Sequence, residues 1–119
     1  MPDKHTTSSV FAKRLKEARI RSGLTQEQLG ISAGIDEFSA SARINQYERG
    51  KHLPHLVVGQ RLARALHVPT SFLYEEDDLL ATLLATAARL TRARKKILLV
   101  NAETLTRPVS SKGKKQSDV

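Results

Sequence analysis

Residues 25–51, TQEQLGISAGIDEFSASARINQYERGK, decide the fold of this chain. Thr25 followed three residues later by Gln28 matches the capping box, in which each side chain accepts a hydrogen bond from the other residue's backbone N–H. Gly34 can adopt the positive φ that ends a helix, and Gly30 is small enough to let another helix approach closely. The stretch therefore predicts two short helices joined by a glycine turn, the first over residues 25–33.

The second helix of this stretch is expected to end at Glu48. Three residues are competent N-caps for it, namely Asp36, Ser39 and Ser41. Ile44 and Tyr47, three residues apart, set its buried face, and either Phe38 or Ala40 completes that face. The outward face is polar and nearly free of acids: Ser41, Ala42, Arg43, Asn45, Gln46 and Arg49. A merely solvated helix usually carries both signs of charge, so this face indicates a binding function.

Three further helices are predicted around this pair. An amphipathic pattern over residues 10–21 ends at Gly23, and a second apolar stripe follows Pro54 over residues 56–66. A short fifth helix holding Phe72 and Leu73 closes the core. The fold class is therefore expected to be all-α, with a five-helix domain over residues 10–74.

The remaining segments differ in composition. Residues 1–9 are polar and rich in serine and threonine, and residues 107–119 are basic and poor in apolar side chains, so we expect a disordered arm and a disordered basic tail. Residues 75–106 begin with four acids, residues 75–78, and continue with a leucine-rich stripe, which predicts a C-terminal helical segment. Thr91 can cap a separate helix from residue 92 to about residue 105. One continuous helix with a kink near Thr91 is the alternative.

The composition excludes several classes of protein. The 119 residues include no cysteine and only four scattered histidines, so neither a disulfide scaffold nor a metal site is expected. No apolar run approaches the roughly 20 residues of a membrane span, and the N-terminus lacks the apolar core of a signal peptide, which predicts a cytoplasmic protein without a membrane partner. The net charge of +8 favours a polyanionic partner such as nucleic acid. No nucleophile, base and orienting group converge in the sequence, so we expect neither an enzyme nor a cofactor.

The motifs resemble a known family. The segments LTQEQLGISAGI and INQYERGKHLP are similar to the Cro-type (Xre-like, lambda-repressor-like) helix-turn-helix family, and ALHVPTSFLY resembles the closing helix of that family. The resemblance implies a regulator of transcription that binds double-stranded DNA and inserts the helix around residues 39–48 into the major groove. Between Gly34 and Glu48 this chain has about four residues more than the family pattern, which could lengthen the helix by about one turn or enlarge the loop before it.

The resemblance also assigns roles to individual residues. The expected DNA-binding set is Gln26, Ser39, Ser41, Ala42, Arg43, Asn45, Gln46 and Lys51. Within it, Gln26 would touch a phosphate and brace the recognition helix, and Lys51 would contact the DNA backbone. Arg43 and Gln46 have the hydrogen-bonding groups to read guanine and adenine edges in the major groove. Two residues outside the set, Arg19 and Glu48, are expected to form a structural ion pair.

The preferred function is a dimeric bacterial or phage repressor, localised to the nucleoid through its DNA binding. One recognition helix covers few base pairs, so such domains usually present two helices about 34 Å apart. The candidate homodimer contact is the apolar C-terminal segment, through Leu80, Leu83, Leu84, Ala87, Ile97 and Leu98. This segment could instead fold back on its own domain. Two other functions stay open: an antitoxin whose C-terminal segment covers a toxin while it represses its own operon, and a protein-interaction adaptor that has kept the fold.

Overall fold

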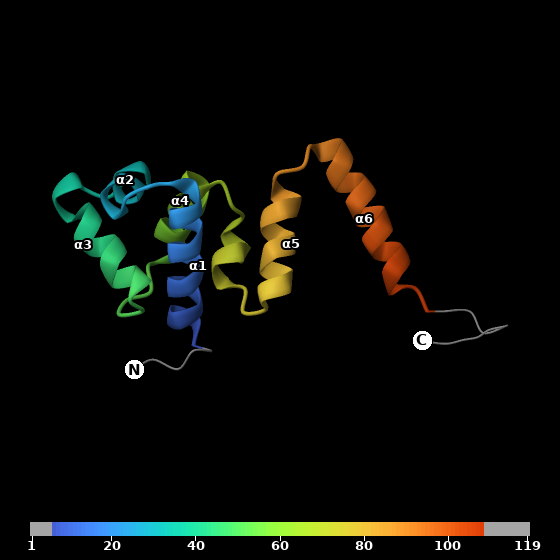
Figure 1. The fold of residues 1–119 in the computed structure, drawn as a ribbon, viewed down its shortest axis with the longest axis horizontal. Helices are drawn as coiled ribbons and strands as arrows, with labels where there is room; N and C mark the ends of the chain where they lie inside the picture. The colour runs from blue at the N-terminus through green and yellow to red at the C-terminus, as the bar shows by residue number, and fades with distance from the viewer. Residues whose placement is uncertain (1–5, 109–119) are drawn as a thin grey trace. The chain divides into compact units, whose positions relative to one another are not determined.

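The computed structural model describes residues 6–108, and all regular structure in this range is helical (Figure 1). The elements are α1 Thr7–Ser22, α2 Gln26–Ser32, α3 Glu37–Glu48, α4 Leu56–Leu66, the 3-10 helix η1 Thr70–Tyr74, α5 Asp78–Ala88 and α6 Arg92–Thr106. The expected all-α fold is therefore confirmed. The chain divides into two compact units, residues 1–88 with α1 to α5 and residues 89–119 with α6.

Helix α1 starts earlier than the sequence indicated. The Thr6 hydroxyl accepts a hydrogen bond from the backbone N–H of Ser9 at 3.2 Å, so Thr6 is the N-cap and Thr7 the first helical residue. The expectation of a disordered arm up to Ser9 is wrong for residues 6–9, because a stretch that looked merely polar contains a helix cap. Residues 1–5 of that arm lie outside the described range. At its other end α1 stops at Gly23, which has the expected left-handed conformation with φ 73°.

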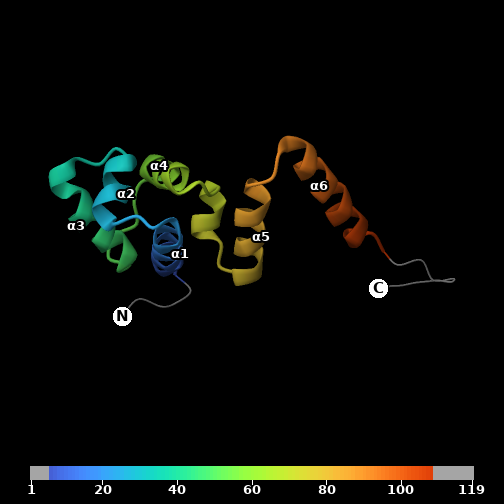
Figure 2. The same cartoon turned by 45° about the horizontal axis from the view of Figure 1, so that its top comes forward.

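One apolar core joins the helices of the first unit. Its largest fully buried side chains are Phe11, Leu15, Leu29, Ile44, Leu62 and Leu73. The Phe11 ring lies edge-on to Tyr47 of α3, with 6.5 Å between centroids, and packs at 5.3 Å against Tyr74 of η1. These contacts tie α1 to both α3 and η1. In two views α2 and α3 lie together at the end of the unit opposite α5 (Figures 1 and 2).

Helix α5 belongs to the first unit. Ala81 and Ala85 are buried in the same core as Phe11 and Leu73. The expected domain boundary after Tyr74 thus differs from the observed unit, which continues to Ala88. Small alanines on one face of α5 allow it to approach η1 closely, a feature hidden within the longer leucine-rich pattern.

A buried arginine holds the start of α5 against α1. Arg14 is only 4% exposed, and its Nε and Nη2 donate to the carbonyl oxygens of Glu75 at 2.8 Å and Glu76 at 3.1 Å. Its Nη1 lies 2.9 Å from Asp78 Oδ1, and its guanidinium stands 5.9 Å from the centre of the Phe72 ring. These contacts satisfy the buried guanidinium and fix the chain between η1 and α5.

Helix α6 is separate from α5. The Thr91 hydroxyl accepts from the backbone N–H of Arg94 at 3.2 Å, so the expected cap is present and the C-terminal segment consists of two helices rather than one kinked helix. None of the residues of α6 is buried. Arg107 ends the helix, and residues 109–119 of the expected basic tail lie outside the described range.

Candidate nucleic-acid interface

Helix α2 and the turn after it position α3. The Gln28 N–H donates to Thr25 Oγ1 at 3.0 Å, and the Thr25 N–H donates to Gln28 Oε1 at 2.9 Å, which confirms the capping box. Gly34 has φ 87°, and the Ile35 N–H donates to the Gly30 carbonyl at 2.9 Å. The turn is therefore closed by backbone hydrogen bonds and requires glycine at position 34.

The extra residues between Gly34 and the rest of the motif lengthen α3. Asp36 is the N-cap, and its Oδ2 accepts from the Phe38 N–H at 3.1 Å. Ala40 is fully buried against α2, whereas Phe38 is 92% exposed, so Ala40 is the residue that joins Ile44 on the inner face. The five residues 36–40 thus form a capped first turn rather than a larger loop.

A buried ion pair links α1 to the end of α3. Arg19 Nε lies 2.5 Å from Glu48 Oε2, and Arg19 Nη2 donates to Glu48 Oε1 at 3.1 Å. The hydrogen bond to Glu48 raises the pKa of Arg19 above its ordinary value. Arg19 Nη1 also donates to the Leu24 carbonyl at 2.9 Å, so the pair expected from the sequence is present and extends to the chain before α2.

Gln26 connects α2 to the same pair. Its Nε2 donates to Glu48 Oε1 at 3.1 Å and to Asn45 Oδ1 at 3.3 Å. The predicted bracing of α3 by Gln26 is therefore visible in the structure. The second of these bonds engages the Asn45 side-chain carbonyl oxygen, and Asn45 is partly buried.

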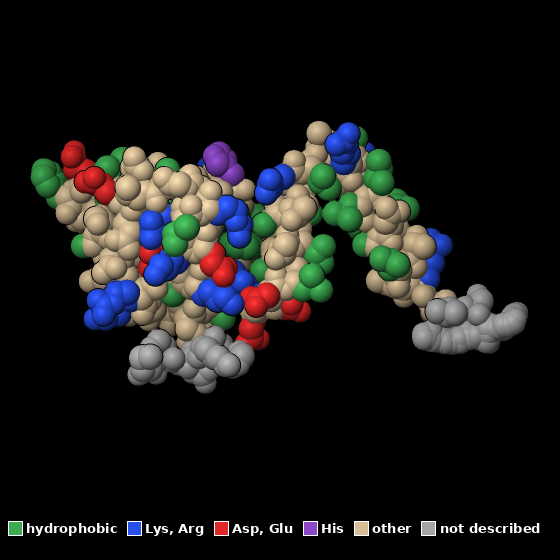
Figure 3. Space-filling view, viewed as in Figure 1, with side chains coloured by type: hydrophobic (Ala, Val, Ile, Leu, Met, Phe, Trp, Pro, Cys, Tyr) green, Lys and Arg blue, Asp and Glu red, His purple; other side chains and the backbone are tan. Residues whose placement is uncertain are grey.

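Most of the predicted DNA-binding residues are exposed, on α3 or directly after it. Ser41, Ala42, Arg43, Gln46 and Lys51 are exposed, while Ser39 is partly buried. Within residues 6–108, no acid forms an ion pair with Arg43, Arg49 or Lys51. Figure 3 shows acidic side chains at the end of the unit where α3 begins and Lys and Arg side chains near the end where it stops. Positive charge is thus available beside the polar face of α3.

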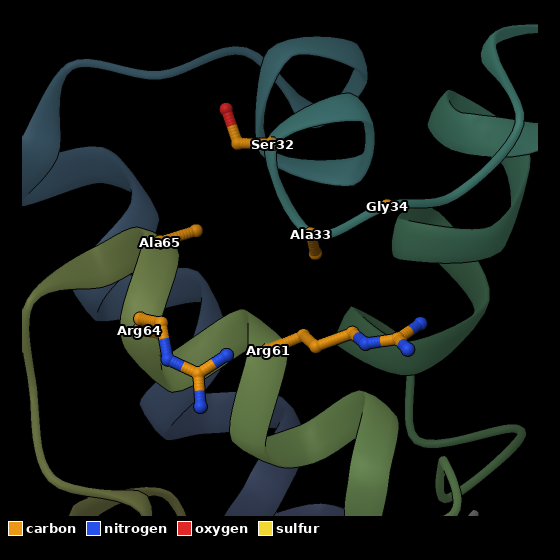
Figure 4. Close-up of a pocket in the computed structure, with 6 residues that line it drawn as sticks. All are labelled: Ser32, Ala33, Gly34, Arg61, Arg64 and Ala65. Atoms are coloured by element: carbon orange, nitrogen blue, oxygen red, sulfur yellow. The ribbon is translucent and has the colours of Figure 1, made fainter.

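A second basic surface lies on α4 and was not assigned a role from the sequence. Arg61 and Arg64 line an open pocket of about 340 Å³ together with Ser32, Ala33, Gly34 and Ala65 (Figure 4). Neither arginine pairs with an acid of the described chain. The pocket exists because α2 packs on α4. It could not be predicted from the sequence of α4, which shows only two arginines on its outer face.

Two kinds of site are not formed by the described residues. No group of three or more His, Cys, Asp or Glu side chains in this part of the chain could hold a metal ion. None of the helices between residues 6 and 108 combines the length and apolarity needed to cross a bilayer.

Comparison with known proteins identifies the motif. The sequence model of a helix-turn-helix domain family matches residues 10–71, from α1 into η1 and just over half of the chain. This chain belongs to that helix-turn-helix family. The chain is also 35% identical, over 66 residues, to an uncharacterized HTH-type transcriptional regulator of Methanothermobacter thermautotrophicus, a match that covers 53% of this chain and 90% of the relative.

A solved structure resembles the helix-turn-helix protein over a longer range. The crystal structure of transcriptional regulator BswR matches with a TM-score of 0.73 and 48% identity, covering 78% of this chain and 92% of BswR. The likeness therefore extends beyond the family domain at residues 10–71. The first unit carries a DNA-binding domain of the transcription-regulator type, and the resemblance noted in the sequence is confirmed.

Proposed function

We propose that this protein is a sequence-specific, dimeric repressor that inserts α3 into the major groove of double-stranded DNA. The observation that carries the proposal is the outer surface of α3 and its exit turn. It presents hydrogen-bonding side chains together with Arg43, Arg49 and Lys51, none of which pairs with an acid among residues 6–108, and α3 is braced by contacts of Arg19, Gln26 and Glu48. A surface that is both rigid and positively charged suits the reading of base edges beside phosphates.

Base reading would come from the exposed middle of α3. Arg43 can donate two hydrogen bonds to guanine O6 and N7, and Gln46 can pair with adenine N6 and N7. The Ala42 methyl can contact a thymine methyl, and Ser41 can bond to more than one base. Ser39 and Asn45, which are partly buried, would contribute less to direct readout.

Phosphate contacts would set the position of the domain on DNA. Lys51 is exposed directly after α3, and the backbone N–H groups at the start of α2 lie beside Gln26. The positive end of a helix and a lysine both favour phosphate oxygens. Both amide hydrogens of Gln26 are used by Glu48 and Asn45, so Gln26 would reach a phosphate by exchanging its 3.3 Å hydrogen bond to Asn45 Oδ1 for one to a phosphate oxygen.

Dimerisation would involve exposed apolar side chains on α5 and on α6. The inner face of α5 is filled by Ala81 and Ala85, which leaves Leu79, Leu80 and Leu83 exposed. Leu84 and Ala87, also on α5, are partly buried. On α6, Ile97 and Leu98 are exposed. A second copy of the chain would cover the exposed apolar side chains of either helix and present two α3 helices to one operator.

An antitoxin is the second candidate, and the exposed apolar run of α6 favours it. Ile97, Leu98, Leu99 and Val100 are all exposed. A protein partner could cover this run while the first unit binds DNA. Sedimentation of the purified chain alone separates the two: a stable dimer supports self-association, and a DNA-binding monomer favours a different partner.

Selection of binding sites from random DNA with the purified full chain tests the proposal. We expect an enriched sequence with two symmetric half-sites, separated by about one helical turn of DNA. A chain that enriches no sequence and binds DNA only through charge contradicts the proposal and favours the adaptor function.

A further inference from the structure

The most unusual side chain on the surface of the first unit is Phe38. Phenylalanine is among the residues most often buried, yet Phe38 is 92% exposed. Single exposed apolar residues are common on proteins and need no explanation by themselves. Phe38 differs from them in how firmly its backbone is held and in the helix face that it joins.

The backbone around Phe38 is fixed on both sides. Asp36 caps the helix through the Phe38 N–H, and the Ser39 N–H donates to the Asp36 carbonyl at 2.9 Å. Two residues later Ala40 packs on Gly30 so closely that a Cβ at position 30 would lie 2.7 Å from the Ala40 Cβ. The extra turn is therefore a rigid extension of α3, which fixes the position of the Phe38 backbone and the direction of its Cα–Cβ bond.

That direction is the outer face of α3. Residues 38, 42, 45 and 49 follow each other at intervals of four, three and four, so at about 100° per residue they form one stripe along the helix. The buried residues of α3, Ala40, Ile44 and Tyr47, lie on the opposite side. Phe38 thus lies on the same helix face as Ala42, one turn closer to the N-terminus of α3.

The charges beside Phe38 decide what it can contact on DNA. Asp36 and Glu37 are exposed at the same end of α3, where the helix N-terminus favours negative charge (Figure 3). Carboxylates repel phosphates, so this end is unsuited to lie on the DNA backbone. An aromatic ring flanked by acids fits the centre of the groove better, where thymine offers the only methyl group among the base edges.

We propose that Phe38 contacts the C5-methyl group of a thymine and is a specificity-determining residue of this protein. The inference rests on the proposed insertion of α3 into the major groove. One helical turn is about 5.4 Å, or about one and a half base-pair steps of DNA. The thymine therefore lies one or two base pairs from the base pair that faces Ala42.

The test replaces each thymine of the selected site, one at a time, with deoxyuridine, which lacks only the methyl group. Binding is measured by fluorescence anisotropy for the wild-type chain, Phe38→Ala, Phe38→Leu and the matched control Ile31→Ala, which shortens an exposed side chain at the far end of α2 from Gln26. For the wild type we expect one thymine in each half-site at which loss of the methyl weakens binding about fourfold. Phe38→Ala should bind the thymine and deoxyuridine sites equally, Phe38→Leu should keep part of the difference, and Ile31→Ala should behave as wild type.

Three results would overturn the inference. The first is a selected site without a methyl-sensitive thymine, and the second is a thymine preference that Phe38→Ala leaves unchanged. The third is a change of oligomeric state in Phe38→Ala at unchanged DNA specificity, which would place Phe38 in a protein interface. A wild-type chain that selects no site contradicts the proposed function itself, whereas a selected site with any of these three results contradicts only the role of Phe38.

Discussion

Gly30 and Ala40 touch where α2 crosses α3. A Cβ built on Gly30 would lie 2.7 Å from the Ala40 Cβ, a distance that real Cβ atoms essentially never show, and 3.1 Å from the Ala40 carbonyl oxygen, which is tighter than most real Cβ contacts. The absence of a side chain at position 30 therefore allows the added first turn of α3 to rest directly on α2. This contact makes the start of α3 a rigid element.

Gly30→Ala is predicted to lower the free energy of unfolding by about 1–3 kcal/mol, because the new methyl group collides with Ala40. In an uncrowded helix the same change would stabilise the protein by about 0.5–1 kcal/mol, so the sign of the effect is informative. Urea denaturation measures it. The double variant Gly30→Ala with Ala40→Gly should lose less stability than the sum of the single variants, and strict additivity would contradict the contact.

Glu48→Ala is predicted to cost about 3 kcal/mol of unfolding free energy, because it leaves the mostly buried Arg19 guanidinium without its carboxylate. Gln26 loses a hydrogen-bond acceptor in the same variant. Thermal and urea unfolding provide the measurement, with Arg21→Ala as the control for an exposed basic residue of α1. Equal losses in the two variants would show that the ion pair adds nothing to stability.

Asp78 is predicted to stabilise the first unit in a pH-dependent way. Its hydrogen bond to Lys13 at 3.0 Å and its contact with Arg14 hold the pKa of the Asp78 carboxyl below its ordinary value of 3.8. A carboxyl whose pKa is lower in the folded protein than in the unfolded chain stabilises the fold when the pH is above its pKa in the unfolded chain. This stabilisation is lost as the pH falls through its pKa in the folded protein. Asp78→Asn should therefore be less stable than wild type at neutral pH and equally stable once the pH is below the depressed pKa. A difference that persists unchanged into acid would refute the assignment, and Glu37→Gln serves as the control for an exposed acid.

Arg43→Ala and Lys51→Ala are predicted to affect DNA binding in different ways. The loss of Arg43 should cost about 1–3 kcal/mol on the selected site and relax the preference at one base pair, because it removes a base contact. The loss of Lys51 should weaken binding to all sequences and reduce the salt dependence by about one phosphate contact. Binding titrations over a range of salt concentrations separate the two outcomes. An unchanged base preference in Arg43→Ala would remove this residue from the readout.

A truncated protein that ends at Ala88 is predicted to have a free energy of unfolding close to that of the full chain. For a truncated protein that ends at Tyr74, the free energy of unfolding should be lower by about 2–4 kcal/mol. The shorter chain exposes the core surface covered by Ala81 and Ala85 and removes the Glu75 and Glu76 carbonyl oxygens that accept from the buried Arg14. Denaturation of both truncated proteins tests this, and sedimentation of the longer one shows whether α5 dimerises without α6. Equal stability of the two truncated chains would contradict the docking of α5.

Several features were predictable from the sequence because they depend on neighbours within one or two turns of a helix. The Thr25–Gln28 capping box, the left-handed Gly23 and Gly34 and the cap at Thr91 are of this kind. The helix cap at Thr6 is also a local feature and could have been predicted in the same way. The serine- and threonine-rich stretch around it was instead expected to be disordered. The pairing of Arg19 with Glu48 spans a longer distance in the chain and was expected only through the resemblance to a known family.

By itself the sequence determined the helix order, the glycine turn and the polar face of α3, since side-chain periodicity and capping act locally. The tertiary structure decided the rest. Whether residues 36–40 form a turn of helix or a loop depends on the contact of Ala40 with Gly30, and whether Phe38 or Ala40 is buried follows from the same contact. The docking of α5 depends on Arg14 reaching carbonyl groups more than sixty residues away, and no local pattern encodes such an approach.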